Sequence, residues 1–326
     1  MRKLRVGVIG LGHNGLAFCR AYASLPDTEL VAVCDRDEQR AEAAQREFGV
    51  KAYYDYAILE RDDIDIISIH TPDHLHREPF IKALEADKHI LLEKPMANSI
   101  EDLKLMVKAA DRSKKKVAVG QILRFNPMFE AVKRLVDNGI LGEIAYLEAD
   151  YYHDLRYQRF MERWKLDEEI PIVGGGVHPF DLLRWYAGEA VEVTSYSNHK
   201  TYPEMKADTS IVSIFRFKSG CTGKVGALYG SPLAMPEYYN LGVYGTKASF
   251  CRGRLACDGI EGWMNIPIQT PPGHPFEPEI VDLVRAIREG REPRCNARDG
   301  AMSALGVLCA YQSAIEGKAI KIPEDF

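Results

Sequence analysis

Short, largely apolar runs recur at regular intervals through the first 120 residues of the chain. They cover residues 6–9, 30–34, 64–69, 89–92 and 117–119, and strands that are buried on both faces of a sheet have this pattern. Segments with the composition or the periodicity of helices lie between them. Strands and helices that alternate with short connections predict a parallel, doubly wound sheet, and so an α/β fold, for this part of the chain.

The segments between these runs carry the end signals of helices. Residues 37–48 are rich in Ala, Glu, Gln and Arg and are followed by Gly49, a residue type that commonly ends helices. Ser99 and Asp102 resemble a capping box, and apolar residues recur after them at helical spacing. We also expect a helix over residues 15–24, directly after the first strand.

After residue 122 the pattern changes. A helix over residues 127–138 leads into longer and more polar strands, at residues 144–152, 191–197, 209–217, 223–229 and 239–244. Turns that contain Gly, Lys, Ser or Pro separate these strands, which favours an antiparallel sheet. Two helical segments, residues 278–289 and 300–314, follow. We therefore predict two domains, residues 1–122 and residues 123–326.

The composition is that of an ordinary soluble globular protein. Hydrophobic residues make up 46% and charged residues 27% of the 326 residues, and the formal net charge is -5 at pH 7. This balance offers no basic field for nucleic acid or an anionic membrane, and no apolar stretch approaches the roughly 20 residues of a membrane span. The chain runs directly into a strand, so we expect no signal peptide and a cytoplasmic protein. The seven cysteines form no Cys-x-x-Cys pair, and we expect reduced thiols and no metal site.

The turn after the first strand has the sequence Gly10-Leu11-Gly12-His13-Asn14-Gly15 and opens a predicted helix. Three glycines in this context permit a tight turn, a close approach of the backbone to a pyrophosphate, and close packing of the helix on the strand. The free N–H groups and the dipole of the helix N-terminus attract phosphates. The motif predicts that residues 1–122 form a dinucleotide-binding Rossmann domain. Its cofactor candidates in the turn are Gly10, Gly12, His13, Asn14 and Gly15.

Asp35 ends the second predicted strand, twenty residues beyond the last glycine of the turn. An acid at this position accepts the hydroxyl groups of the adenosine ribose, and its charge repels a 2′-phosphate. The neighbouring Arg36 can pair with such a phosphate. We therefore predict NAD as the cofactor, with NADP as the alternative.

Three further segments carry a resemblance that covers essentially the whole chain. They are residues 71–76 (Thr-Pro-Asp-His-Leu-His), residues 93–95 (Glu-Lys-Pro) and residues 174–181 (Gly-Gly-Gly-Val-His-Pro-Phe-Asp). Together with the glycine turn they resemble the Gfo/Idh/MocA family of glucose–fructose oxidoreductase, inositol dehydrogenase and relatives. The resemblance implies that residues 123–326 form an α/β domain with an open, mainly antiparallel sheet for substrate binding and oligomerisation. We accordingly expect a homodimer or homotetramer formed through this sheet.

Two residues are candidates for the reacting groups. Oxidation of an alcohol needs a cation beside the oxygen and a base for the hydroxyl proton. Lys94 stands at the carboxyl end of a predicted parallel strand, where such sheets bind ligands, and the resemblance places it between cofactor and substrate. His178 matches the family's catalytic histidine. Pro179 suits the first position of a helix, which would put His178 at the cap, where the neutral, proton-accepting ring is favoured.

The remaining candidates surround these groups. The resemblance places Thr71, Pro72, His76 and Glu93 beside the cofactor, and a metal-binding pair of His74 and His76 is the weaker alternative. Aromatic and hydrogen-bonding side chains after residue 150 suit a polyhydroxylated ring, although the tyrosines there can equally pack at a subunit interface. The substrate candidates, besides Lys94 and His178, are Arg124, Tyr152, His153, Arg156 and Asp181.

One position departs from the family's pattern. Many members carry an aspartate four residues before the histidine, and Gly174 stands there in this chain. Asp181 is a candidate substitute, since it lies on the same helical face as His178. We predict an NAD(P)-dependent dehydrogenase that transfers hydride between the nicotinamide and a secondary alcohol carbon of a sugar, sugar derivative or inositol. The departure leaves open a redox-neutral glycosidase that works by oxidation, elimination and reduction, and a non-catalytic NAD-binding regulatory protein is the third alternative.

Overall fold

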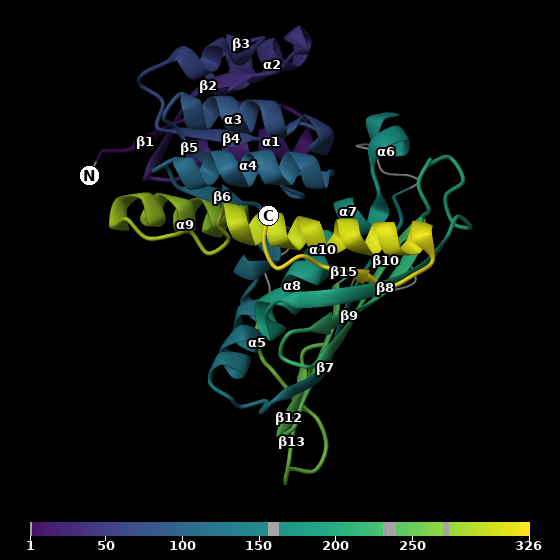
Figure 1. Cartoon of the computed structure of the whole chain (residues 1–326). Coiled ribbons are helices and arrows are strands. Elements are labelled where there is room, and N and C mark those ends of the chain that lie inside the picture. Colours follow the sequence, from purple (N-terminus) through teal and green to yellow (C-terminus); the bar gives the residue numbers. More distant parts are fainter. Residues whose placement is uncertain (1, 156–162, 231, 233–238, 270–273) are drawn as a thin grey trace. The chain divides into compact units, whose positions relative to one another are not determined.

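The computed structural model describes residues 2–155, 163–230, 232, 239–269 and 274–326 (Figure 1). It divides the chain into two compact units. Unit 1 comprises Met1–Ile122 and His274–Ala301, and unit 2 comprises Leu123–Gly273 and Met302–Phe326. The first boundary between the units falls after residue 122. Residues 274–301, however, belong to the first unit and not to the second.

Unit 1 is built on a six-stranded sheet in which every pair of neighbouring strands is parallel. Its order is β3-β2-β1-β4-β5-β6, so the chain reverses direction across the sheet between β1 and β4, where ligands of such sheets bind. The doubly wound fold predicted from the apolar runs is confirmed. The strands are β1 (Leu4–Ile9), β2 (Thr28–Cys34), β3 (Lys51–Tyr53), β4 (Ile66–Ile69), β5 (His89–Leu92) and β6 (Val117–Val119).

Helices connect the strands of unit 1 (Figure 1). They are α1 (His13–Ser24), α2 (Glu38–Phe48), α3 (Arg77–Glu85) and α4 (Ile100–Arg112), with short 3-10 helices at Tyr56–Glu60, Asp73–Leu75 and Ile122–Phe125. The predicted end signals act as expected. Gly49 adopts a left-handed conformation with φ 67° at the end of α2, and the Ser99 side chain accepts a hydrogen bond of 3.1 Å from the backbone N–H of Asp102.

The helix α9 (Phe276–Glu289) explains why a C-terminal segment belongs to unit 1. Its buried face contributes Ile280, Leu283 and Val284 to the same apolar core as Val6 of β1 and Phe18 of α1. Burial of apolar area is the main favourable term in folding, so this core is incomplete without α9. The sequence shows the amphipathic helix but not the sheet against which it packs.

Unit 2 contains a nine-stranded sheet of order β14-β13-β12-β11-β7-β10-β9-β8-β15 among the described residues. Its neighbours are antiparallel except for β7 and β10, which run parallel, so the predicted mainly antiparallel sheet is confirmed. The strands are β7 (Ile144–His153), β8 (Ala190–Asn198), β9 (Ser210–Phe217), β10 (Thr222–Tyr229), β11 (Tyr239–Gly245), β12 (Ala248–Cys251), β13 (Arg254–Cys257), β14 (Met264–Asn265) and β15 (Ile320–Lys321).

Helices cover one face of this sheet. The helix α8 (Val177–Ala187) packs on β7 and β10, and the Oγ of Ser313 in α10 (Ala297–Glu316) accepts a hydrogen bond of 3.0 Å from the backbone N–H of Ser195 in β8. The other helices of unit 2 are α5 (Pro127–Asp137), α6 (Arg163–Glu168) and α7 (Pro171–Gly174). In the part of the chain that the structure describes, no helix is long and apolar enough to cross a membrane.

A titratable group in the sheet of unit 1 makes stability depend on pH. Burial, together with Lys115, lowers the pKa of His89 to about 4, and its Nδ1 accepts a 2.9 Å hydrogen bond from the backbone N–H of Lys116. The unfolded chain takes up a proton at this residue near the ordinary pKa of about 6.5. The folded chain does so only near 4, so the contribution of His89 is present above pH 6.5 and is lost as pH falls towards 4.

We therefore expect the free energy of unfolding to fall as pH is lowered through this window. The variant His89→Asn keeps a hydrogen-bond acceptor but cannot titrate, so it should flatten the pH dependence by at most about 1.4 kcal/mol per pH unit. Urea unfolding at a series of pH values between 7.5 and 4.5 measures the slope. The control is His74→Asn at an exposed position, and a slope for His89→Asn as steep as that of the wild type would contradict the prediction.

Candidate active site

The turn between β1 and α1 has the geometry of a cradle for a pyrophosphate. Gly10 has φ 89°, and a Cβ placed on it would lie 2.5 Å from the carbonyl carbon and oxygen of His70. A Cβ on Gly15 would lie 1.9 Å from the carbonyl oxygen of Gly10, whereas a Cβ on Gly12 would meet nothing within 4 Å. No side chain caps α1, and no acidic residue lies in its first turn. The turn therefore offers N–H groups and open space, and it fits a bound dinucleotide.

Asp35 is fixed beside this turn by backbone hydrogen bonds. Its Oδ2 accepts from the N–H of Leu11 at 2.7 Å, and its Oδ1 accepts from the N–H of Asp37 at 2.9 Å. A carboxylate has about four lone-pair sites, so both oxygens retain capacity for ribose hydroxyl groups. The neighbouring Arg36 is exposed.

The carboxyl ends of β4 and β5 bring together a network around Glu93. The Nδ2 of Asn14 donates to Glu93 Oε1 at 3.2 Å, the backbone N–H of Lys94 donates to Oε2 at 3.1 Å, and His70 Nδ1 lies 3.6 Å from Oε1. Burial alone would raise the pKa of Glu93, but His70, Lys94 and His76 outweigh it and lower that pKa. An ionised carboxylate therefore lies directly beside Lys94.

A second buried carboxyl nearby has the opposite behaviour. Glu279 of α9 is almost fully buried, and neither of its oxygens has a hydrogen-bond partner among the described residues. Its Oε1 lies 3.4 Å from the position of a Cβ on Gly120, just beyond β6. Burial, followed by the charge of Glu93, raises the pKa of Glu279 well above its ordinary value. The pKa values of the two carboxyls are thus shifted in opposite directions.

His76 has a different place from the one we expected. Its ring is fully buried, and its Nδ1 and Nε2 lie 2.9 Å from the carbonyl oxygens of Pro95 and Thr71. Burial lowers the pKa of His76. The ring therefore links the backbone of Thr71 to that of Pro95 in the Glu-Lys-Pro segment. Thr71 and Pro72 themselves are half-buried. No group of three or more His, Cys, Asp or Glu side chains in the described part of the chain could hold a metal ion.

In unit 2, His178 lies inside the first turn of α8 and not at its cap. The helix begins at Val177, and its N-cap is Gly176 with φ -65° and ψ -17°. The backbone N–H of His178 donates to the carbonyl oxygen of Gly175 at 3.2 Å. Because the glycines already have helical backbone angles, the helix starts before Pro179, whose missing N–H has no cost in a first turn. The expected cap position is therefore wrong, although His178 does lie at the N-terminal end of a helix.

The ring of Tyr151 packs beside the buried ring of His178. The ring centroid of Tyr151 lies 6.1 Å from that of His178, with an interplanar angle of 22°. Tyr151 also contacts Tyr229 at 5.8 Å and His153 at 5.6 Å between ring centroids. Tyr152 points to the opposite face of the sheet, where a Cβ on Gly226 would lie 2.8 Å from its hydroxyl. The substrate candidate Tyr152 therefore lies on the other face of the strand from Tyr151, because side chains of a strand alternate between its faces.

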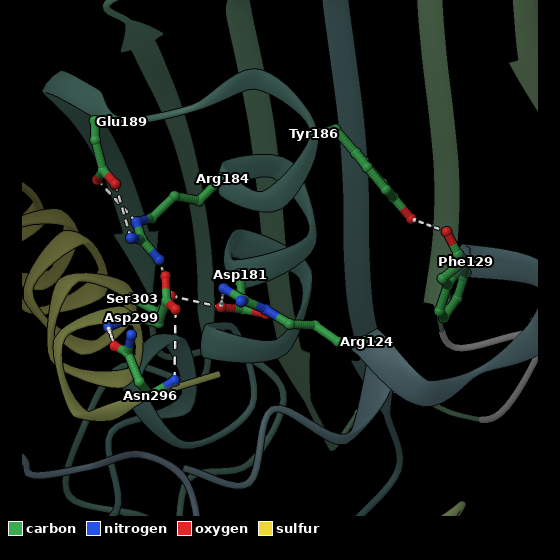
Figure 2. Close-up of polar contacts among 9 residues, drawn as sticks. All are labelled: Arg124, Phe129, Asp181, Arg184, Tyr186, Glu189, Asn296, Asp299 and Ser303. Atoms are coloured by element: carbon green, nitrogen blue, oxygen red, sulfur yellow. Dashed lines mark hydrogen bonds and ion pairs between the residues drawn. The ribbon is translucent and has the colours of Figure 1, made fainter. Parts of the chain in front are cut away.

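Arg124 and Asp181 pair with each other (Figure 2). The Nε and one terminal nitrogen of Arg124 each lie 2.8 Å from an oxygen of Asp181, and both side chains are buried. Ser303 donates to Asp181 Oδ1 at 2.6 Å, and Arg184 donates to Ser303 at 3.2 Å. A buried bidentate pair holds its charges by mutual compensation. The carboxylate of Asp181, a candidate for orienting His178, is therefore engaged by Arg124 and Ser303. The guanidinium of Arg124, a candidate for the substrate, is engaged by Asp181.

The space beside Gly174 is filled by Glu169. A Cβ on Gly174 would lie 2.4 Å from Glu169 Oε1, and this oxygen accepts a 2.8 Å hydrogen bond from the hydroxyl of Tyr229. Glu169 and Tyr229 are not among the candidates that the sequence offers, and Tyr151 is one only as part of the aromatic segment after residue 150. Strand alternation would have placed Tyr151 with the buried Leu147, but no local signal reveals Glu169. The candidate Arg156 lies outside the described residues.

Known proteins match both units. Residues 4–121 match the oxidoreductase family with an NAD-binding Rossmann fold, and residues 129–251 match the GFO/IDH/MocA C-terminal domain. The chain is similar to scyllo-inositol 2-dehydrogenase (NAD(+)) of Bacillus subtilis (strain 168), with 30% identity over 344 residues that cover 98% of this chain and 96% of the relative.

Two further similarities differ in extent. Glycosyl hydrolase family 109 protein 2 of Shewanella sp. (strain ANA-3) is 34% identical over 169 residues, which cover 48% of this chain and 37% of that protein. The solved structure of levoglucosan dehydrogenase in complex with NADH has a TM-score of 0.84 and 25% identity, and the match covers 99% of this chain and 100% of that chain.

The chain therefore belongs to the Gfo/Idh/MocA family of oxidoreductases with an NAD-binding Rossmann fold. The predicted family, the α/β fold and the NAD-dependent dehydrogenase class are confirmed. Lys94 belongs to unit 1 and His178 to unit 2.

Substitutions in the glycine turn should separate packing from cofactor binding. We expect Gly12→Ala to cost at most about 1 kcal/mol of stability, because its Cβ meets no protein atom. The same Cβ enters the space in front of the helix N-terminus, so NADH should bind about tenfold more weakly or worse. Gly15→Ala should instead destabilise unit 1 by about 1–3 kcal/mol through its contact with Gly10.

Fluorescence titration with NADH and thermal unfolding measure the two effects on each variant. NADH binding by Gly12→Ala at wild-type affinity would contradict the assignment of the cradle, and so would a Gly15→Ala variant as stable as the wild type.

Proposed function

We propose that this protein oxidises a secondary alcohol carbon of a sugar, sugar derivative or inositol. The observation that carries this proposal is the cluster at the end of β5, where Lys94 follows an ionised Glu93 at the ligand-binding edge of the sheet. The similarity to an inositol dehydrogenase over almost the whole chain supports the substrate class.

Bound NAD supplies the hydride acceptor, held by the glycine turn and by Asp35. The ammonium group of Lys94 stabilises the negative charge that develops on the substrate oxygen. His178 accepts the hydroxyl proton, and the stacked ring of Tyr151 restricts the orientation of the imidazole. His153 lines the same side of the strand as Tyr151 and offers a hydrogen-bonding group to further hydroxyls.

The cofactor preference follows from the position of Asp35. Its carboxylate is fixed beside the turn by two backbone N–H groups, where it accepts ribose hydroxyls and repels a 2′-phosphate. NAD is therefore preferred to NADP. The exposed Arg36 favours NADP only if its side chain replaces Asp35 at the ribose.

The redox-neutral glycosidase is the less favoured alternative. The glycosyl hydrolase similarity covers about half of this chain, whereas the dehydrogenase similarity covers nearly all of it. Product analysis separates the two, because a dehydrogenase accumulates NADH and a redox-neutral enzyme releases sugar without net NADH.

The decisive experiment assays the purified protein with NAD or NADP against sugars, inositols and glycosides. We expect net NADH formation with at least one polyol, and we expect Lys94→Ala and His178→Ala each to lower kcat/KM by at least about 100-fold. The control is Lys82→Ala on α3, whose ammonium pairs with Glu78 on the helix surface. Full activity of Lys94→Ala would refute its role, and NADH binding without any turnover would favour a regulatory protein.

We further propose that the protein forms a homodimer or homotetramer through the face of the unit 2 sheet that lies opposite α8 and α10. Adjacent strands β8 and β9 expose Tyr196, Val212 and Ile214 there, with exposed fractions of 79%, 42% and 45%. These side chains form an apolar stripe, which in a soluble protein favours association.

A charge in this stripe should separate the subunits. We expect the double variant Val212→Asp/Ile214→Asp to lower the mass measured by light scattering after size exclusion, because a charge buried in an interface is not compensated. The matched control is Ile315→Asp on α10, where the side chain is 64% exposed. An unchanged mass for the double variant would exclude this face as the interface.

A further inference from the structure

Glu169 is a buried carboxyl that the proposed chemistry leaves without a role. The residue is 9% exposed and lies between α6 and α7. Its Oε1 accepts a hydrogen bond of 2.8 Å from the hydroxyl of Tyr229. Its Oε2 is buried without a hydrogen-bond partner among the residues that the structure describes. Burial of such a group has a free-energy cost, so its position calls for an explanation.

The room for this carboxyl exists because residue 174 is a glycine. A Cβ on Gly174 would lie 2.4 Å from Oε1, 2.9 Å from Cγ and 3.0 Å from Cδ of Glu169. Real Cβ atoms do not approach other atoms so closely. A side chain at position 174 and the Glu169 carboxyl therefore exclude each other, and a carboxyl attached at position 174 would occupy the place of the one from Glu169.

Contacts within unit 2 connect this carboxyl to His178. The hydroxyl of Tyr229 and the ring of Tyr151 both pack against Gly175, where a Cβ would lie 2.7 Å and 2.6 Å from them. The Tyr151 ring contacts Tyr229 at 5.8 Å and stacks on His178 at 6.1 Å between ring centroids. Glu169, Tyr229, Tyr151 and His178 thus form a continuous chain of contacts across the start of α8.

We propose that Glu169 is a positioning residue for His178 in the oxidation proposed above, on which this inference rests. Its carboxyl fixes the Tyr229 hydroxyl, Tyr229 holds the ring of Tyr151, and Tyr151 sets the orientation of the imidazole that accepts the proton. The carboxyl reaches this place from position 169 because Gly174 leaves the space open.

The kinetic test separates positioning from a merely structural role. We expect Glu169→Ala to lower kcat by about 10- to 100-fold, with KM within about threefold of the wild type, because no substrate contact is lost. Glu169→Gln keeps an oxygen that accepts from Tyr229, so its kcat should stay within about fivefold of the wild type. The matched control is Glu168→Ala, an exposed neighbour.

Removal of the donor should have the same effect as removal of the acceptor. We expect Tyr229→Phe to lose as much of kcat as Glu169→Ala, and the double variant to lose no more than either, because both substitutions remove one interaction. Multiplicative losses in the double variant, or a Glu169→Gln loss as large as that of Glu169→Ala, would overturn the proposal.

A rescue tests the shared place of the two side chains. Glu169→Ala/Gly174→Asp returns a carboxyl to this space and should recover at least about tenfold of the kcat lost in Glu169→Ala. Gly174→Asp alone should remain impaired, since Glu169 still fills the space. Absence of recovery in the double variant would refute a role for the carboxyl at this place.

Thermal unfolding makes the test independent of turnover. Gly174→Asp should lower Tm by about 4 °C or more beyond its effect in the Glu169→Ala background, because only the wild-type glutamate clashes with it. Equal effects in both backgrounds would refute the placement of Glu169. If the wild type oxidises no alcohol in the broad panel, the proposed function fails. The comparison of Tm values in the two backgrounds still tests whether Glu169 and a side chain at position 174 compete for one place.

Discussion

The approach of Gly15 to the carbonyl oxygen of Gly10 is the constraint on which the cofactor half of the molecule depends. It lets the first helix begin directly at the end of the central strand, with no side chain capping the helix N-terminus. Because the strands beside β1 are parallel, their carboxyl ends reach the same edge. Asp35, the Thr71 loop and Glu93 with Lys94 follow these ends, so a contact between two glycines sets the position of the whole edge.

The charge of the two carboxyls near that edge, Glu93 and Glu279, depends on their burial and on the groups beside them. Burial opposes ionisation of Glu93, but His70 and Lys94 outweigh it and lower the pKa of that carboxyl, whereas burial and the charge of Glu93 raise the pKa of Glu279. Two neighbouring carboxylates repel each other, so the charge of one raises the pKa of the other.

The sequence predicts most of the fold and the cofactor edge, but only part of the substrate side. Strands β1, β2 and β5 follow from local apolar runs. The glycine turn predicts a dinucleotide site because it lies between a strand and a helix. The pairing of Arg124 with Asp181 cannot be read from the local sequence, because the two residues are far apart in the chain, whereas the face on which Tyr152 lies follows from strand alternation. A charged residue in a motif can be taken for a substrate ligand as long as its ion-pair partner is unknown. The partner of Asp181 lies 57 residues away in the sequence. Glu169 is invisible to motif analysis for the same reason, since its role depends on the absence of a side chain at Gly174.

The return of α9 to the first unit has a consequence for how the protein is made. Strand β1 and helix α1 leave the ribosome early, but Ile280, Leu283 and Val284, which complete their core, come after nearly all of unit 2. Unit 2 in turn needs Met302–Phe326. Neither unit is finished until the C-terminal helices have been synthesised, so apolar surface of β1 and α1 stays uncovered while unit 2 is being made.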